Sequence, residues 1–465
     1  MELFDNTICA PATAAGGAIS VVRVSGSRAL EIASGIFRPA SLRSSLSACE
    51  GYTLHFGTIL DGAEPVDDVL VSVFRAPHSY TGEDSVEISC HASPFIIQKI
   101  LDLLVAGGCR MAAPGEFTQR AFVNGKMDLS QAEAVADIIA AQTSAAHRIA
   151  LNQMKGCFSD ELADMRQRLL RIVSLMELEL DFSEEDVEFA DRDELKLLLD
   201  EVIARIEGLI GSFRLGNAIK NGVPVVIAGP ANSGKSTLLN AILGENRAIV
   251  SDIAGTTRDT VEETFNVDGV LFRFIDTAGL RESGDAIERI GIERSYEAIS
   301  RASVVLCVVD ISSDAETISN TMEDVHSRVT AEQKLIYVLN KADIASPEQI
   351  AFVNSLAGRD IAETFLVSAK SKAGLGTLLE HIAHSFNILN KSSETTLVSN
   401  LRHKQALDSA LSSLIRVREG ICSGTPTDLI SQDIREALYH LSSIVGEIST
   451  DEILGNIFRN FCVGK

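Results

Sequence analysis

The segment from Val225 to Ser236 constrains the fold more than any other part of the chain. The apolar residues Val225 to Ala228 predict a buried strand, and the residues that follow read Gly-Pro-Ala-Asn-Ser-Gly-Lys-Ser. This is the phosphate-binding pattern G-x-x-x-x-G-K-S between a strand and a helix, the context that the motif requires. Backbone N–H groups and the helix N-terminus would surround the phosphates, Lys235 would reach the outer phosphates, and Ser236 would bind Mg²⁺. The segment predicts a nucleotide-binding α/β domain.

Two later segments select the base. Asn340-Lys341-Ala342-Asp343 follows the apolar run Leu335 to Leu339 and has the pattern N-K-x-D. The carboxylate of Asp343 can accept hydrogen bonds from N1–H and the exocyclic amine of guanine, whereas adenine has no donor at either position. Ser368-Ala369-Lys370 follows the predicted strand Thr364 to Val367 and fits a second base-contacting loop. Together these segments predict a guanine nucleotide.

A third segment, Asp276-Thr277-Ala278-Gly279, ends the apolar run Leu271 to Ile275. Its carboxylate can hold a water molecule on Mg²⁺, and the N–H of Gly279 can contact the γ-phosphate. In Ras-type GTPases the next residue is a Gln that orients the attacking water, but here it is Leu280, which cannot form a hydrogen bond through its side chain. Another group must therefore position the water.

Apolar patterns divide the rest of the chain. Between about residues 222 and 388, short apolar runs alternate with helices, which is typical of βαβ units and a mostly parallel sheet. Residues 1 to about 120 combine strand-like runs with a helix that we expect to begin at Ser93-Pro94, and so predict an α+β domain. The strand-like runs are Ile19 to Val24, Val69 to Phe74 and Ser85 to Ser89.

A helical region is predicted to follow from Asp128. Ser130 and Glu133 predict a capping box at its start, and apolar residues from Val135 to Ile149 fall on one helical face. Helical periodicity returns near the C-terminus, after the polar stretch at Lys391 to Glu394. The simplest architecture is a helical domain with an α/β domain inserted into it.

Composition excludes several classes of protein. A length of 465 residues predicts about three domains, and 46% hydrophobic residues exclude a chain that is disordered throughout. The net charge of −23 excludes a generally basic nucleic-acid-binding surface. The 8 cysteines include no C-x-x-C pair, which argues against a zinc ribbon or a disulfide framework. The acidic N-terminus and the lack of an apolar run of about 18 residues predict a cytoplasmic protein with no membrane segment.

The segment Ser251-Asp252-Ile253-Ala254-Gly255-Thr256-Thr257-Arg258-Asp259 and the chain end Phe461-Cys462-Val463-Gly464-Lys465 carry a family resemblance. With the nucleotide motifs, they resemble the bacterial and organellar tRNA modification GTPases of the MnmE (TrmE) family. The resemblance implies an α+β folate-binding-like N-terminal domain for dimerisation at 1–120 and a discontinuous all-α helical domain at 121–215 and 389–465. It also implies an inserted α/β P-loop GTPase (G) domain at 216–388.

The resemblance also implies roles around the nucleotide. In this family, the G domains of a homodimer meet when K⁺ is present, and K⁺ takes the place of an arginine finger. The catalytic residues would be Lys235 and Glu288, whose carboxylate would orient the attacking water through another water. Mg²⁺ would bind Ser236 and Thr257, and K⁺ would bind Asn232, Ser251, Ile253 and Thr256. The GTP contacts would be Asn232, Ser233, Gly234, Lys235, Ser236, Thr237, Ser251, Thr256, Thr257, Asp276, Thr277, Ala278, Gly279, Asn340, Lys341, Asp343, Ser368, Ala369 and Lys370.

A tetrahydrofolate derivative is implied for the N-terminal domain, in the 5,10-methylene form, with the 5-formyl form as an analogue. Its ligands would be Arg23, Glu87, Lys126 and Lys465. A carboxylate suits the donor edge of a pterin, and cations suit the acidic tail of folate. Taken without the resemblance, Arg23 and Glu87 are more simply edge-strand charges or a mutual salt bridge.

Cys462 is implied to be necessary for the modification. It could act as a nucleophile, act as an acid or base, or position the reacting groups, and the alternative is a buried structural thiol. A prenylation signal is disfavoured, because Gly464 is not aliphatic, Lys465 is not a usual last residue and no polybasic run precedes the tail.

The implied function is K⁺-stimulated GTP hydrolysis coupled to tRNA modification. With an FAD-dependent partner of the MnmG (GidA) type, the protein would add an aminomethyl or carboxymethylaminomethyl group to C5 of the wobble uridine of certain tRNAs. A ribosome-assembly switch of the Era or Der kind explains the nucleotide motifs equally well, but it should carry a basic RNA-binding module. We expect tRNA binding to depend largely on the partner and on local patches such as Arg402-His403-Lys404. For the pair His381 and His384, we favour a helix surface over a metal site.

Overall fold

The computed structural model describes residues 6–14, 16–41, 45–181, 192–245, 263–267, 270–275, 298–330, 333–349, 363–387, 396–423, 425–448, 451–459, 461 and 464. The chain divides into two compact units. One comprises Met1–Ala140, Ala150–Ile203 and Asp408–Lys465, and the other comprises Ala141–Ile149 and Ala204–Leu407.

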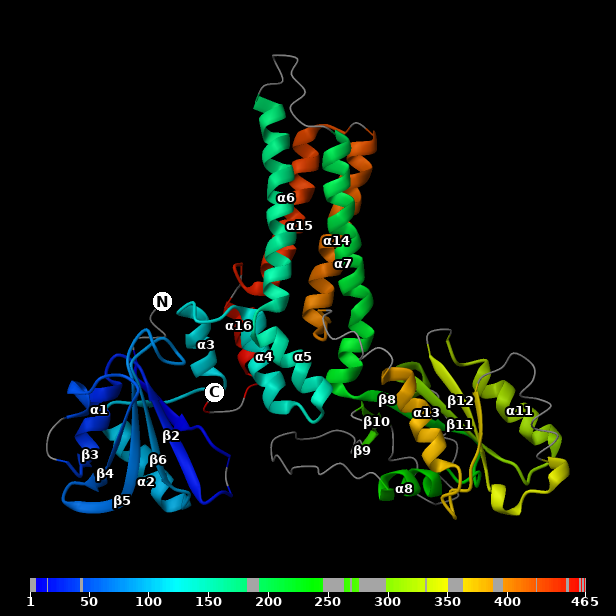
Figure 1. Cartoon of the computed structure of the whole chain (residues 1–465), viewed down its shortest axis with the longest axis horizontal. Coiled ribbons are helices and arrows are strands. Elements are labelled where there is room, and N and C mark those ends of the chain that lie inside the picture. The colour runs from blue at the N-terminus through cyan, green and yellow to red at the C-terminus, as the bar shows by residue number, and fades with distance from the viewer. Residues whose placement is uncertain are drawn as a thin grey trace. The chain divides into compact units, whose positions relative to one another are not determined.

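A seven-stranded sheet in the order β3-β4-β5-β6-β2-β1-β7 forms the N-terminal part of the first unit (Figure 1). Its strands are β1 (Ile8–Pro11), β2 (Ile19–Ser25), β3 (Phe37–Pro39), β4 (Thr53–Asp61), β5 (Glu64–Phe74), β6 (Ser85–His91) and β7 (Arg110–Met111). A short 3-10 helix, η2 (Leu46–Ala48), precedes β4. All neighbouring strands are antiparallel except β1 and β7. The structure confirms the α+β prediction and the three predicted strands.

Helices α1 (Ala29–Ile36) and α2 (Pro94–Ala106) pack on one face of this sheet. The core contains Val22 and Val24 of β2 together with Ile100 and Leu104 of α2. Side chains alternate between the faces of a strand, so Arg23 lies on the face opposite these helices. Ser93 occupies the expected N-cap position of α2, with Pro94 in the first turn, although its side chain makes no capping hydrogen bond.

The helical region begins differently from the prediction. Helix α4 (Leu129–Ala140) follows α3 (Glu116–Val123), and its capping box is formed by Asp128 and Gln131. The Asp128 side chain accepts from the N–H of Gln131 at 2.9 Å, and the Gln131 side chain accepts from the N–H of Asp128 at 2.9 Å. The predicted Ser130 and Glu133 box is therefore wrong, because an acid two residues earlier satisfies the helix start.

The expected single helical face from Val135 to Ile149 is also wrong. The chain breaks between α4 and α5 (Ser144–Met154), where the hydroxyl of Thr143 accepts from the N–H of Ala146 at 3.1 Å. This local hydrogen bond competes with helix continuation and starts a new helix.

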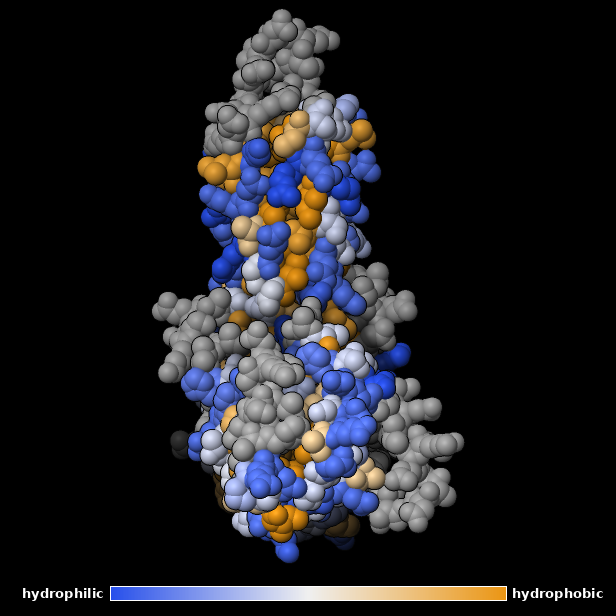
Figure 2. All heavy atoms as spheres, turned by 90° about the vertical axis from the view of Figure 1, so that its right-hand side faces the viewer, coloured by the Kyte–Doolittle hydropathy of each residue, from blue (hydrophilic) through white to orange (hydrophobic). Residues whose placement is uncertain are grey.

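Four long helices contribute to the first unit, where their parts lie side by side (Figure 1), although they come from two distant parts of the sequence. They are α6 (Cys157–Asp181), α7 (Arg192–Asn221), α14 (Leu401–Ser423) and α15 (Thr427–Val445), and α16 (Asp451–Phe458) follows them. Figure 2 shows apolar side chains between polar ones along these helices, as expected for amphipathic helices with an apolar seam. The structure confirms a discontinuous helical domain. The predicted boundaries at 120/121 and 215/216 fall inside α3 and α7.

A six-stranded sheet in the order β13-β12-β11-β8-β10-β9 organises the second unit. Its strands are β8 (Val223–Ala228), β9 (Glu263–Val267), β10 (Val270–Phe274), β11 (Val304–Asp310), β12 (Lys334–Asn340) and β13 (Glu363–Leu366). All are parallel except β9. Helices α8 (Lys235–Glu245) and α13 (Leu375–Asn387) contribute to one core and α11 (Ala315–His326) contributes to another, so this is the predicted inserted α/β domain. Within the described residues, no helix is long and apolar enough to span a membrane.

Candidate functional site

The phosphate-binding loop and both base-contacting segments follow the carboxyl ends of parallel strands. The loop 229–234 follows β8, Asn340 ends β12, and Ser368 comes shortly after β13. Ligands of open parallel sheets bind at this edge. The topology therefore brings three sequence motifs to one place, as the sequence predicted.

Two glycines allow the loop to turn closely against its neighbours. Gly229 has φ +142°, and a Cβ there would lie 2.3 Å from the carbonyl oxygen of Val308. Gly234 has φ +94°, and its Cβ would lie 2.1 Å from Nδ2 of Asn340. Lys235 donates from Nζ to the carbonyl oxygens of Gly229 at 2.9 Å and Pro230 at 2.7 Å. The ammonium group therefore lies over the loop that would hold the phosphates.

Asn340 joins the phosphate-binding loop to the second base-contacting loop. Its Nδ2 donates to the carbonyl oxygen of Ser233 at 2.8 Å, and its Oδ1 accepts from the N–H of Ala369 at 3.0 Å. The residue is 2% exposed, so its amide group is committed to these contacts. Asn340 therefore holds the loops in place.

Asp343 is a charged acceptor at the predicted base position. The hydroxyl of Ser368 donates to its Oδ1 at 2.7 Å, and this hydrogen bond is the main cause that lowers the pKa of Asp343. The carboxylate is solvent-exposed and ionised, as recognition of the guanine donors requires.

Asp310, at the end of β11, is a partner that sequence reasoning missed. Lys341 lies in the left-handed region with φ +67° and donates from Nζ to Oδ2 of Asp310 at 2.5 Å. Burial would raise the pKa of Asp310, but hydrogen bonds from Lys341 and Ser312 outweigh burial and lower it. The sequence did contain a signal for this site, because Asp310 is an acidic residue at the end of a buried apolar strand.

The structure describes only some of the other residues that we predicted to bind the nucleotide. Asn232, Ser236, Thr237 and Lys370 are exposed, and Asn232 has φ +61°. Several predicted site residues lie outside the described residues: Ser251, Ile253, Thr256, Thr257, Asp276, Thr277, Ala278, Gly279, Glu288, Cys462 and Lys465.

Arg23 and Glu87 form the mutual salt bridge that was the alternative interpretation from sequence. They are directly opposite each other on β2 and β6, and Nε and Nη2 of Arg23 each lie 2.9 Å from Oε1 of Glu87. Nη1 of Arg23 also donates to the carbonyl oxygen of Gly464 at 3.5 Å. The structure therefore brings the pair together with the backbone of Gly464.

Two aromatic rings that sequence reasoning missed surround the Arg23 guanidinium. Its Cζ lies 5.3 Å from the ring centre of Tyr80 and 5.6 Å from that of Phe117, within the range of cation–π interaction. Burial raises the pKa of Tyr80, against smaller opposite effects of Thr118 and Arg23. Nothing in the sequence pattern connects these distant residues.

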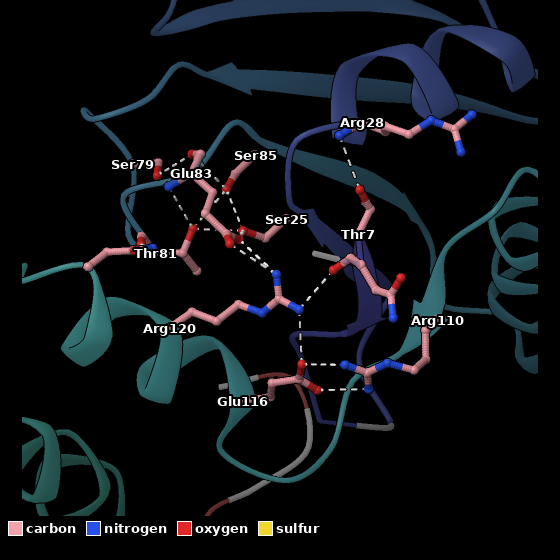
Figure 3. Close-up of polar contacts among 12 residues, drawn as sticks. Thr7, Ser25, Arg28, Ser79, Thr81, Glu83, Ser85, Arg110, Glu116 and Arg120 are labelled. Atoms are coloured by element: carbon pink, nitrogen blue, oxygen red, sulfur yellow. Dashed lines mark hydrogen bonds and ion pairs between the residues drawn. The ribbon is translucent and has the colours of Figure 1, made fainter. Parts of the chain in front are cut away.

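A buried ionic network supports the loop that carries Tyr80 (Figure 3). Arg120 of α3 is 0% exposed and lies 3.0 Å from a carboxylate oxygen of Glu83 and 3.0 Å from one of Glu116. Glu116 also pairs with Arg110, and Glu83 accepts from the hydroxyl of Ser25 at 2.7 Å. These contacts fix α3, β7 and the β5–β6 loop to one another.

Lys126 contacts the same loop, since its Nζ donates to the carbonyl oxygen of Pro77 at 2.9 Å. The structure also places two groups of histidine-containing residues. His403 is buried, so the patch at Arg402-His403-Lys404 is not a continuous basic surface. His381 contacts Glu363, and no group of at least three potential metal ligands occurs among the described residues.

Comparison with known proteins identifies the family. The family model of the N-terminus of the GTP-binding protein TrmE matches residues 7–126, and the family model of the MnmE helical domain matches residues 129–462. The tRNA modification GTPase MnmE of Bacteroides thetaiotaomicron is 51% identical over 99% of each chain. The protein of the same name from Parabacteroides distasonis is 51% identical over 99% of this chain and 100% of that one.

A solved GTP-binding protein from Sulfolobus solfataricus in complex with GDP matches 48% of this chain and 67% of that chain, with 16% identity. Its TM-score of 0.28 is too low to support an inference. The full-length relatives and the family models show that this chain belongs to the MnmE family of tRNA modification GTPases.

Proposed function

We propose that this chain is a GTPase that acts in tRNA modification. Together with an FAD-dependent partner of the MnmG type, it would add an aminomethyl or carboxymethylaminomethyl group to C5 of the wobble uridine of certain tRNAs. The GTPase part of this proposal rests on one observation. The Asn340 side chain hydrogen-bonds both Ser233 and Ala369, an arrangement that we call the Asn340 clamp, and the ionised Asp343 lies three residues further along the chain. A ribosome-assembly switch is less well supported, because the relatives match over the whole chain.

The residues of the loop suit the two cations. The amide of Asn232 is exposed, and an amide oxygen is a suitable ligand for a hard cation such as K⁺. Ser236 lies in the first turn of α8, where its hydroxyl would bind Mg²⁺. We propose that Thr257 joins Ser236, and that Ser251, Ile253 and Thr256 join Asn232. The cations would stabilise charge that develops on the phosphates.

Lys235 and Glu288 would have different roles in GTP hydrolysis. Lys235 would leave the carbonyl oxygens of Gly229 and Pro230 to bind the outer phosphates, which are stronger acceptors for a charged donor. Glu288 would orient the attacking water in place of a Gln, because Leu280 cannot. GTP hydrolysis would drive opening and closing of a homodimer rather than the carbon chemistry.

The Arg23–Glu87 pair fits a tetrahydrofolate derivative. Its side chains are 18% and 28% exposed, so a ligand can reach both charges without unfolding the sheet. The carboxylate would accept from the pterin donors, and Lys126 and Lys465 would bind the acidic tail. When bound, the folate would supply the one-carbon unit, and Cys462 would act close to it.

Replacing the base-recognising acid tests this function. Asp343→Asn exchanges one acceptor for an amide donor, which matches xanthine, where a carbonyl oxygen stands in place of the guanine amine. We expect the variant to lose GTP hydrolysis and to hydrolyse xanthosine triphosphate. Asp314→Asn is the matched control, because it caps α11 in the same unit and Asn also caps well. GTP turnover that survives Asp343→Asn unchanged would refute the site.

A further inference from the structure

We propose that Gly464 is a positioning residue that seats the chain end beside the Arg23–Glu87 pair, in a place where no residue with a side chain fits. The inference rests on the proposed function, because the position of the chain end matters only if Arg23, Glu87 and Cys462 act in the modification.

The backbone of β1 leaves no space for a Cβ at this position. Gly464 is buried and has φ +96°, and a Cβ there would lie 1.9 Å from the carbonyl oxygen of Pro11. It would also lie 3.1 Å from Cα of Ala12. Both neighbours are backbone atoms, which cannot move away as a flexible side chain can. A glycine is therefore required by conformation and by space.

Arg23 provides the second contact with the chain end. Its guanidinium is held by Glu87 and by the rings of Tyr80 and Phe117, and it donates to the carbonyl oxygen of Gly464. The tail and the proposed folate site therefore share one guanidinium group.

A third contact fixes the chain before the tail. Gly115 has φ +70°, and a Cβ there would lie 2.7 Å from the carbonyl oxygen of Phe458 and 3.0 Å from Cβ of Phe461. Phe458 and Phe461 also pack in a core with Leu129 and Leu454. Phe461 and Gly464 are thus both held against the N-terminal part of the first unit.

Release of Lys465 by carboxypeptidase B measures this docking on a protein that consists of residues 1–465. The exopeptidase must bind the last residues in its own cleft, so it acts only on chain ends that have left Pro11. We expect Gly464→Ala to speed release by about tenfold or more, which corresponds to about 1.4 kcal/mol. Gly62→Ala is the matched control, because Gly62 has φ +61° but no atom within 4 Å of a Cβ. It should keep the wild-type release rate.

Function is measured on the same variants. In cells lacking the protein, Gly464→Ala should restore as little modified uridine as Cys462→Ser, while the purified variant keeps wild-type GTP turnover. An unchanged release rate, or fast release with full modification, would overturn the proposal. If Cys462→Ser restores full modification and the wild type fails to bind 5-formyltetrahydrofolate in calorimetry, the proposed role of this site fails instead. The rates at which carboxypeptidase B releases Lys465 from these variants would still show whether Gly464 holds the C-terminal residues in place.

Discussion

Asn340 donates a hydrogen bond of 2.8 Å from Nδ2 to the carbonyl oxygen of Ser233, although 107 positions separate the two residues. The bond joins the end of β12 to the phosphate-binding loop after β8. The same side chain accepts from the N–H of Ala369, so one buried amide sets the relative position of the predicted phosphate and base sites.

Asn340→Ala should weaken GTP binding. It leaves two buried backbone groups without their partner, and each costs about 1–3 kcal/mol, so we expect a loss of at least about tenfold in affinity. Titration of a fluorescent guanine nucleotide measures this. Asn221→Ala, which removes an exposed hydrogen bond to Asn217 on α7, should leave the affinity unchanged. Equal affinities for both variants would contradict the clamp.

Arg120→Met should strongly destabilise the first unit. Removal of the guanidinium takes away the buried cation that Glu83 and Glu116 share and leaves Arg110 as the remaining cation beside Glu116, which costs about 3–5 kcal/mol. Arg28→Met is the control, because the Arg28–Glu31 pair is 54% and 66% exposed, and screening by water makes its contribution to stability small. The stability of the two variants is compared by urea unfolding, which is monitored through hydrogen exchange of the backbone amides of residues 85–91. A similar small effect of both substitutions would show that the network is not stabilising.

The stability of the same region should depend on pH through Glu116. Burial would raise its pKa, but Arg110, the N–H of Ala113 and Arg120 outweigh burial and lower it. Because the folded pKa lies below the unfolded value of about 4.3, the stabilisation is present above that value and is lost as pH falls through the folded pKa. Glu116→Gln should therefore be less stable than wild type at pH 7, and the difference should shrink below about pH 4. A difference that stays constant from pH 7 to pH 3 would argue against a charged Glu116.

Glu288→Ala should keep GTP affinity and lose most turnover, since the residue is proposed to orient water and not to bind nucleotide. Single-turnover hydrolysis with K⁺ present, together with nucleotide titration, separates the two effects. An unchanged kcat would remove Glu288 from the mechanism.

Local patterns predicted the parts of the fold that depend on short stretches of sequence. The loop from Gly229 to Ser236, the strand before it and the base-contacting segments lie as expected, because neighbouring residues determine each of them. The capping box was misplaced because Ser130 and Asp128 both suit a helix start, and only the folded contacts distinguish them.

Contacts between distant residues could not be predicted. Arg120 and Glu83 show no pattern that connects them, and neither do Arg23 and Phe117, because burial of a charge is decided by tertiary packing. The Arg23–Glu87 pair was considered only because each charge interrupts an apolar strand. Its neighbours Tyr80 and Gly464 were found only from the structure.

Mass spectrometry of tRNA nucleosides tests the central claim most directly. Cells lacking this protein would be complemented with the wild-type chain, with Lys235→Ala or with Cys462→Ser. We predict that the wobble uridine loses its C5 aminomethyl-type group without the protein and regains it only with the wild type. An unchanged nucleoside profile, accompanied by ribosomal subunits that fail to mature, would contradict the claim.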